Sequence, residues 1–325
     1  MTRWKCDNRP MRALLLRASF VVMFVCGVAM IRAAAQDPAT AAAPGDPLEL
    51  VKQARKLNNE GKQDAALELY RQVLERSPDL FDAHLGAGIA LDLQGNYKDA
   101  RKHLARAIEL APDGGKNQAL STMAVSYAFE RDAAAASRFY RQVFDRQEST
   151  QDLGGAAETA NALGRIYLES GDFDNALKWY QTGYETSRRQ PKLTGDQIDL
   201  WTMRWAHAQA RIAARKGNVE DARKQTAVVK SILDKGTNED QQIQYPYLAG
   251  YVALYSKDYQ TAIDELQKAD QRDPFILVLL AQAHEKAGDA ARAREYYSQV
   301  LASNAHSTNN AFARPLARKK AGATH

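Results

Sequence analysis

The chain has 325 residues, of which 45% are hydrophobic and 26% are charged, a composition typical of a folded protein. A chain of this length can hold two ordinary domains or one long repeat array. Six basic residues and one acidic residue lie in the first 35 positions, so the remaining chain is close to neutral. That balance excludes the strongly basic class of nucleic-acid-binding proteins, and no nucleic-acid partner is expected.

The first 35 residues have the pattern of a secretory signal peptide. A basic stretch, residues 1–12, precedes the apolar run 19–31, and the small residues 33–35 suit cleavage before Gln36. We therefore expect an exported protein, either periplasmic or secreted. The alternative is an uncleaved membrane anchor, which would be the chain's only contact with a membrane. The apolar run is short for that role, because a spanning helix needs about 20 apolar residues.

Both cysteines, Cys6 and Cys26, fall within this segment. Cleavage would leave a chain without thiols, which excludes disulfides, cysteine catalysis and thiolate metal sites. Residues 36–47 (QDPATAAAPGDP) lack apolar periodicity, and we expect them to form a flexible linker.

The sequence then repeats. Residues 61–66 (GKQDAA) and 95–100 (GNYKDA) align at a spacing of 34 residues, and each copy continues to a large apolar residue and a proline, Tyr70 and Pro78 in the first. Further copies surround Ala176, Ala262 and Ala293, with weaker ones at Ala136 and Ala222. A fixed period of this length indicates stacked structural units that bury their apolar faces against one another.

This pattern resembles the tetratricopeptide repeat (TPR), in which small residues let two antiparallel helices approach and bulky residues fill the space beside them. The resemblance implies an all-α fold, a right-handed superhelix (α-solenoid) of stacked antiparallel helix pairs. It covers residues 48–301 as about seven repeats, beginning near Leu48, Phe81, Asn117, Ala157, Met203, Ile243 and Pro274. Longer connectors at 147–153 and 189–197 leave open whether the array is continuous or divided into two parts.

Residues 302–325 contain no acidic residue and four basic ones, Arg314, Arg318, Lys319 and Lys320. We expect a disordered tail. The alternative is that residues 312–320 dock on a partner or on the array itself.

No motif for catalysis is found. No two histidines have the spacing of a helical metal pair, and the phosphate-binding and nucleophile-elbow motifs are missing from the sequence. We therefore expect no enzymatic activity, no cofactor and no metal site.

The TPR resemblance implies that the first helix of each repeat lines a concave groove where partners bind. The residues placed there are Glu158, Asn161, Arg165 and Glu169 in the fourth repeat, Arg204, His207, Arg211 and Arg215 in the fifth, and Tyr247, Tyr251 and Tyr255 in the sixth. We predict that the partner-binding residues are Arg165, Arg204, His207, Arg211, Tyr247 and Tyr251. The alternative for the tyrosines is core packing. The clamp that grips C-terminal carboxylates in chaperone-binding members is absent, because Val51 and Gly86 stand at expected clamp positions.

The sequence thus predicts an exported scaffold that binds a partner protein or peptide in its concave groove. The alternative function is a structural or assembly factor of the cell envelope, acting through oligomerisation or docking to a membrane complex. Neither the partner nor the oligomeric state follows from the sequence.

Overall fold

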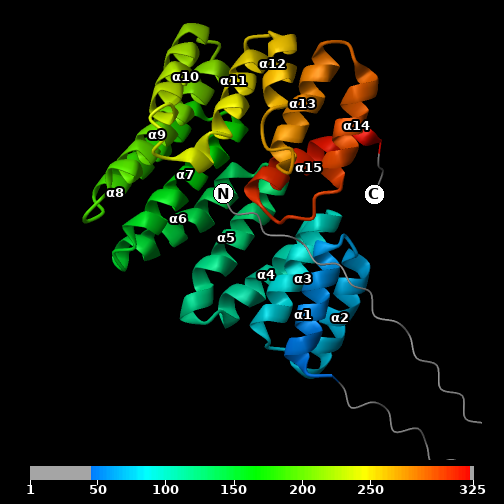
Figure 1. Ribbon diagram of the computed structural model, residues 1–325. Helices are drawn as coiled ribbons and strands as arrows, with labels where there is room; N and C mark the ends of the chain where they lie inside the picture. Colours follow the sequence, from blue (N-terminus) through cyan, green and yellow to red (C-terminus); the bar gives the residue numbers. More distant parts are fainter. Residues whose placement is uncertain (1–44, 323–325) are drawn as a thin grey trace, which may run out of the picture. The chain divides into compact units, whose positions relative to one another are not determined.

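The computed structural model describes residues 45–322, which form one compact unit (Figure 1). The predicted signal peptide and all but the last three residues of the predicted linker lie outside the described residues. The helices, in chain order, are α1 (Pro47–Asn59), α2 (Gln63–Arg76), α3 (Phe81–Gln94), α4 (Tyr97–Leu110), α5 (Asp113–Phe129), α6 (Ala133–Ser149), α7 (Leu153–Ser170), α8 (Phe173–Arg188), α9 (Gly195–Arg215), α10 (Val219–Leu233), α11 (Gln244–Tyr255), α12 (Tyr259–Leu266), α13 (Pro274–Lys286), α14 (Ala290–Leu301) and α15 (Thr308–Ala321). A short 3-10 helix, η1 (Glu239–Gln241), precedes α11. None of the helices in this described range is long and apolar enough to cross a bilayer.

Helices α1 to α14 form seven antiparallel pairs, and each pair packs on the next (Figure 1). The predicted all-α solenoid of stacked helix pairs is therefore confirmed. Contacts also join α1 to α3, α3 to α5, α9 to α11 and α11 to α13. Ion pairs from Arg204 and Arg215 of α9 to Glu158 and Glu169 of α7 link α7 to α9, so the first helices α7, α9, α11 and α13 form an inner row. The longer connectors do not divide the stack, because α6 packs on α7 and α8 packs on α9.

Aspartate and glycine set the turns within several of the pairs. The side chains of Asp132, Asp172 and Asp289 each accept a hydrogen bond from the backbone N–H three residues later, which satisfies an otherwise unpaired donor at the start of α6, α8 and α14. Gly171 ends α7 with a φ of 87°, a left-handed conformation that costs glycine little.

Close helix approach depends on the small residues of the repeat. A Cβ added at Gly164 in α7 would lie 2.7 Å from the ring of Tyr180 in α8, and one at Gly250 in α11 would lie 2.6 Å from Leu266 in α12. Ala176 is completely buried at the same contact between α7 and α8. The two helices of a pair therefore pack closely because a bulky side chain of one helix contacts the backbone of the other at a glycine.

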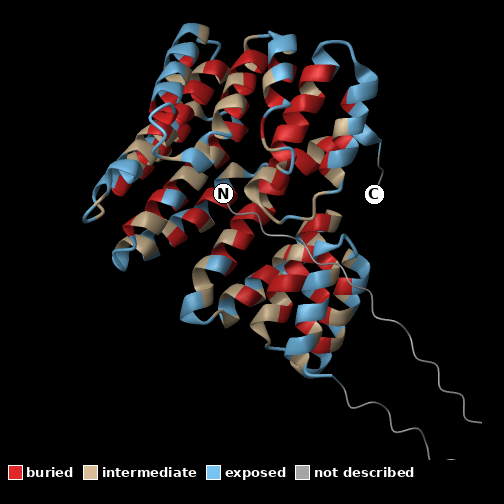
Figure 2. Cartoon of the chain, viewed as in Figure 1, coloured by how far each residue is buried: buried red, intermediate tan, exposed pale blue. Residues whose placement is uncertain are grey.

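The predicted disordered tail is wrong for residues 308–321, which form α15 and pack on α13, α14, α5 and α7. Figure 2 shows buried residues along this helix, and they include Phe312 and Ala317. The alternative, docking on the array, is what the structure shows. The reason is that the apolar face of α15 is buried, while Arg314 donates hydrogen bonds to the backbone carbonyls of Leu93, Leu301 and Ser303.

Candidate functional site

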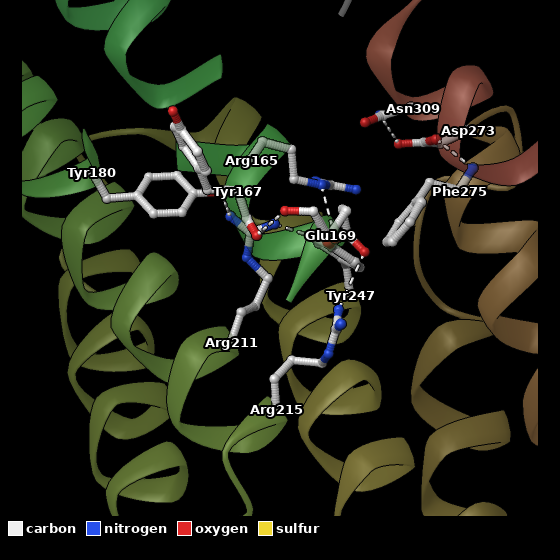
Figure 3. Close-up of polar contacts among 11 residues, drawn as sticks. Arg165, Tyr167, Glu169, Tyr180, Arg211, Arg215, Tyr247, Asp273, Phe275 and Asn309 are labelled. Carbon is white, nitrogen blue, oxygen red and sulfur yellow. Dashed lines mark hydrogen bonds and ion pairs between the residues drawn. The ribbon is translucent and has the colours of Figure 1, made fainter. Parts of the chain in front are cut away.

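Charged and aromatic side chains from α7, α9 and α11 converge inside the solenoid (Figure 3). These helices are the first members of the fourth, fifth and sixth pairs. On each helix the converging residues are four positions apart, so they lie on one face of that helix. Tyr180 of α8, a second helix, joins them. We call the side chains of Arg165, Glu169, Tyr180, His207, Arg211, Arg215, Tyr247 and Tyr251 the inner cluster.

Glu169 is the carboxylate at the centre of the inner cluster. Its Oε1 lies 3.0 Å from Nε of Arg165, one turn earlier in α7, and its Oε2 accepts a hydrogen bond of 3.3 Å from Nη1 of Arg215 in α9. The guanidinium of Arg165 also lies over the ring of Phe275, 4.1 Å from the centroid. One buried carboxylate thus serves two guanidinium groups.

Arg211 has only neutral partners. Its Nη2 donates a hydrogen bond of 2.8 Å to the hydroxyl of Tyr180, and its Nη1 makes a long contact of 3.5 Å with the hydroxyl of Tyr247. The side chain is buried, so this positive charge is removed from water without a carboxylate beside it.

Asp273, the N-cap of α13, lies at the edge of the inner cluster (Figure 3). It accepts hydrogen bonds from the backbone N–H of Phe275 at 2.8 Å and from the side-chain amide of Asn309 at 2.6 Å. Burial raises the pKa of Asp273. Even with this carboxyl ionised, three arginines face two carboxylates, so the region carries excess positive charge.

His207 is the titratable neighbour of these arginines. Burial, and then the charges of Arg211 and Arg165, hold the pKa of His207 well below its usual value. Its ring packs against Tyr247 at 5.4 Å between centroids. The imidazole is therefore neutral at physiological pH and adds a polar group without adding charge.

A cavity of about 460 Å³ opens beside the inner cluster. We call it the inner cavity; its lining residues are Glu158, Asn161, Ala162, Arg165, Tyr180, Met203, Arg204, His207, Arg211, Gln241, Gln244 and Asn309. At its partly exposed side Arg204 forms an ion pair with Glu158. The lining is thus rich in hydrogen-bond donors and has one carboxylate, which is already paired.

Four of the six predicted partner-binding residues line this cavity: Arg165, Arg204, His207 and Arg211. The two tyrosines do not. Tyr251 has no exposed surface and Tyr247 is buried against His207, as the core-packing alternative predicts, and direct contact of either residue with a partner stays a prediction. They are buried because α11 lies between α9 and α13 in the stack.

Sequence reasoning did not place Tyr180, Gln244 or Asn309 at a binding site, although all three line the cavity. Tyr180 lies in α8, the second helix of its pair, and its hydroxyl accepts a hydrogen bond from Arg211. Gln244 begins α11, and Asn309 comes from the segment expected to be disordered. Only the tyrosine carried a signal, because a phenol packed against an arginine-bearing helix needs a hydrogen-bond partner.

A pair of histidines, His84 in α3 and His103 in α4, lies outside the inner cavity. Nδ1 of His84 and Nδ1 of His103 are 3.0 Å apart, across α3 and α4. Residues 45–322 contain no group of three or more side chains arranged to hold a metal ion. This histidine pair therefore supplies a hydrogen bond between the two helices.

Seven stacked helix pairs with a polar cavity on their inner row define an α-solenoid protein. Three tetratricopeptide-repeat family models match residues 57–123, 116–189 and 247–308, which together make up more than half of the chain. The chain belongs to the tetratricopeptide-repeat family.

Solved structures agree with this assignment at the level of the fold. A tetratricopeptide repeat protein from Parabacteroides merdae ATCC 43184 superposes with a TM-score of 0.52 at 10% identity, covering 85% of this chain and 97% of that one. The apo form of RapI superposes with a TM-score of 0.55 at 11% identity, covering 84% of this chain and 98% of that one. No curated protein sequence matches the chain significantly.

Proposed function

We propose that the chain is an exported, non-catalytic scaffold that binds a partner protein or peptide at the inner cavity. The observation that supports this most strongly is the convergence of polar side chains from the inner row of α7, α9 and α11 around one open cavity. Polar groups gathered in a concave site are what fixes the orientation of a bound ligand.

The position of α15 favours this stretch of the groove. The helix packs on α5, α7 and α13, so it covers inner-row helices on both sides of the cavity, while Asn309 at its start lines the cavity wall. A partner that enters the groove would therefore meet the cavity between α7 and α9.

The binding proposal is tested by capturing partners from the native cell envelope with the purified protein. Arg204→Glu reverses a charge at the partly exposed side of the cavity, so we expect the captured partner to be lost. Arg71→Glu is the matched control, because Arg71 is an exposed arginine on α2, a second helix of its pair. Capture of the same partner by both variants and by the unaltered chain would contradict the proposal.

Export is tested separately by cell fractionation and by sequencing the N-terminus of the purified protein. The signal pattern predicts a chain that begins at Gln36 outside the cytoplasm. Recovery of the full-length chain with membranes would favour the anchored alternative. Light scattering of the purified protein distinguishes a monomeric scaffold from an assembly factor that acts by oligomerisation.

A further inference from the structure

Three side chains that line the inner cavity have buried nitrogen atoms without a hydrogen-bond partner in the described part of the chain. They are Nη2 of Arg165, Nε of Arg211 and Nε2 of the neutral His207, all with almost no exposed surface. Arg211 is 6% exposed and His207 is 8% exposed, so both side chains are more than nine-tenths buried. Buried polar atoms in native proteins nearly always have a partner, and unpaired ones need an explanation.

The cavity lining also carries more positive than negative charge. Arg165, Arg204 and Arg211 line it, and the lining carboxylate of Glu158 already forms an ion pair with Arg204. Glu169 does not line the cavity and is shared between Arg165 and Arg215. Arg211 is therefore the cavity arginine without a carboxylate partner among the described residues, and a bound anion would balance its charge.

Several features favour a carboxylate as that anion. A guanidinium presents two parallel N–H groups that match the two oxygens of a carboxylate. The side-chain amides of Asn161, Gln244 and Asn309 line the same cavity and can donate to further oxygens. A volume of about 460 Å³ accommodates an acidic side chain together with part of the segment that carries it.

We infer that the inner cavity binds a carboxylate of the partner, held beside Arg211 and Arg165 with His207 as a neutral neighbour. The inference rests on the proposed function for the identity of the ligand as a protein or peptide. The carboxylate comes from an Asp or Glu side chain or from the C-terminus of the partner. The family's chaperone-tail clamp is not involved, because these residues lie in the fourth and fifth helix pairs and include neither a lysine nor Val51 and Gly86.

The test is isothermal titration of the full purified protein with succinate and with inorganic phosphate. We expect succinate to bind with one site per chain and phosphate to bind more weakly. Arg211→Met retains the volume of the side chain and removes its charge, and it should weaken succinate about 10- to 100-fold because a hydrogen bond to a charged group is lost. Arg106→Met on α4, an exposed arginine, is the control and should leave binding unchanged.

Two tripeptides identify the source of the carboxylate. One has a central aspartate and an amidated C-terminus, and the other is neutral with an unblocked C-terminus. Tighter binding of the first peptide would assign the carboxylate to an acidic side chain, and tighter binding of the second would assign it to the C-terminus. Binding of neither peptide nor succinate would overturn the inference, as would binding of phosphate alone.

A second variant keeps the inference testable if Arg211→Met fails to fold. Asn161→Asp places a carboxylate on the cavity wall without changing the size of the side chain. We expect it to raise the urea midpoint of unfolding and to abolish succinate binding, whereas Gln142→Glu, the same change at an exposed position in the middle of α6, should do neither. An unchanged or lower midpoint for Asn161→Asp, with succinate binding retained, would overturn the inference.

The failure of this inference and the failure of the proposed function give different results. If no oxyanion binds but Arg204→Glu loses the partner, the groove binds its partner by other chemistry. If succinate binds and Arg204→Glu keeps the partner, the carboxylate site stands and the proposed groove function fails.

Discussion

Replacing Glu169 with glutamine tests whether the inner cluster depends on its central carboxylate. The side chain of Glu169 is 7% exposed, and those of its partners Arg165 and Arg215 are 14% and 18% exposed. Glutamine keeps the shape of the side chain and one acceptor oxygen but removes the negative charge. The variant leaves the two arginines buried without a carboxylate, in a region that already holds the charge of Arg211.

The expected cost follows from this burial. Removing one partner of a buried ion pair costs about 3–5 kcal/mol, because the other charge stays desolvated. The amide oxygen of glutamine still accepts one hydrogen bond, so we expect a loss of about 3 kcal/mol in the free energy of unfolding. Glu158→Gln is the matched control: it lies on the same helix and also pairs with an arginine of α9, Arg204, but it is 57% exposed. An exposed pair of this kind contributes about 0–1 kcal/mol.

Urea unfolding followed by tryptophan fluorescence measures the difference in stability between the two variants in the region of the inner cluster. Trp179 lies in α8, and Trp201 and Trp205 lie in α9, so their emission reports on the pairs that hold the inner cluster. Repeat arrays can unfold in segments, and this local probe avoids averaging over the whole stack. If Glu169→Gln and Glu158→Gln lower the stability by the same amount, the charge of Glu169 has no structural importance and our description of the cluster is wrong.

Three further predictions concern packing, pH and α15. Gly164→Ala should lower the free energy of unfolding by about 1–3 kcal/mol, because its Cβ would lie 2.7 Å from the ring of Tyr180, whereas Gly114→Ala has open space and should be neutral or stabilising in urea titrations. Burial lowers the pKa of His207 from 6.5, so the unfolded state binds more protons below that pH and stability falls as the pH drops through it. His207→Phe should remove part of this loss in thermal unfolding between pH 7.5 and 5, and an unchanged pH profile would contradict the assignment. Phe312→Ala should cost about 3–5 kcal/mol and release α15 to proteolysis, and protection equal to the unaltered chain would show that the helix is held by other contacts.

The fold could be predicted because its determinants are local in sequence. Each helix pair closes through residues of the same repeat, such as Gly164 and Tyr180, so their regular spacing reports directly on a contact. The turn aspartates act over three residues, and they too are visible as a pattern. Stacking then follows, since a single pair leaves its apolar face uncovered.

The helix α15 could not be predicted on the same grounds. Its anchors are distant in sequence: Arg314 donates to the carbonyl of Leu93, and His306 lies 2.8 Å from the carboxylate of Asp92. The segment has a proline at position 315 and is rich in polar residues, which by local criteria indicates a tail. Only the tertiary contacts show that its apolar residues have a surface to cover.

The sequence predicted which residues of the candidate site share a helix face, but not which of them are buried. The spacing of Arg204, His207 and Arg211 places all three on one face of α9, and the structure brings them to one cavity with Arg165. The same reasoning placed Tyr251 on the groove, although α11 is covered and its hydroxyl is buried. Periodicity shows which residues share a face, but the elements that cover that face are determined by the complete stack.

These features together limit how a partner can use the groove. The segment leading into α15 reaches the first pair, where the side-chain amide of Gln63 donates a hydrogen bond to Oδ1 of Asn304, and α15 itself packs on α5, α7 and α13. An intramolecular helix thus occupies inner-row surface that a long peptide would need, while Arg165 and Arg211 at the cavity each keep a donor without a hydrogen-bond partner among residues 45–322. The cavity wall at Asn309 is fixed by the same helix, through its bond to Asp273. If the proposed function holds, a short acidic segment suits this surface best, because it can enter one cavity without displacing α15, and a preformed wall reduces the entropy lost when it binds.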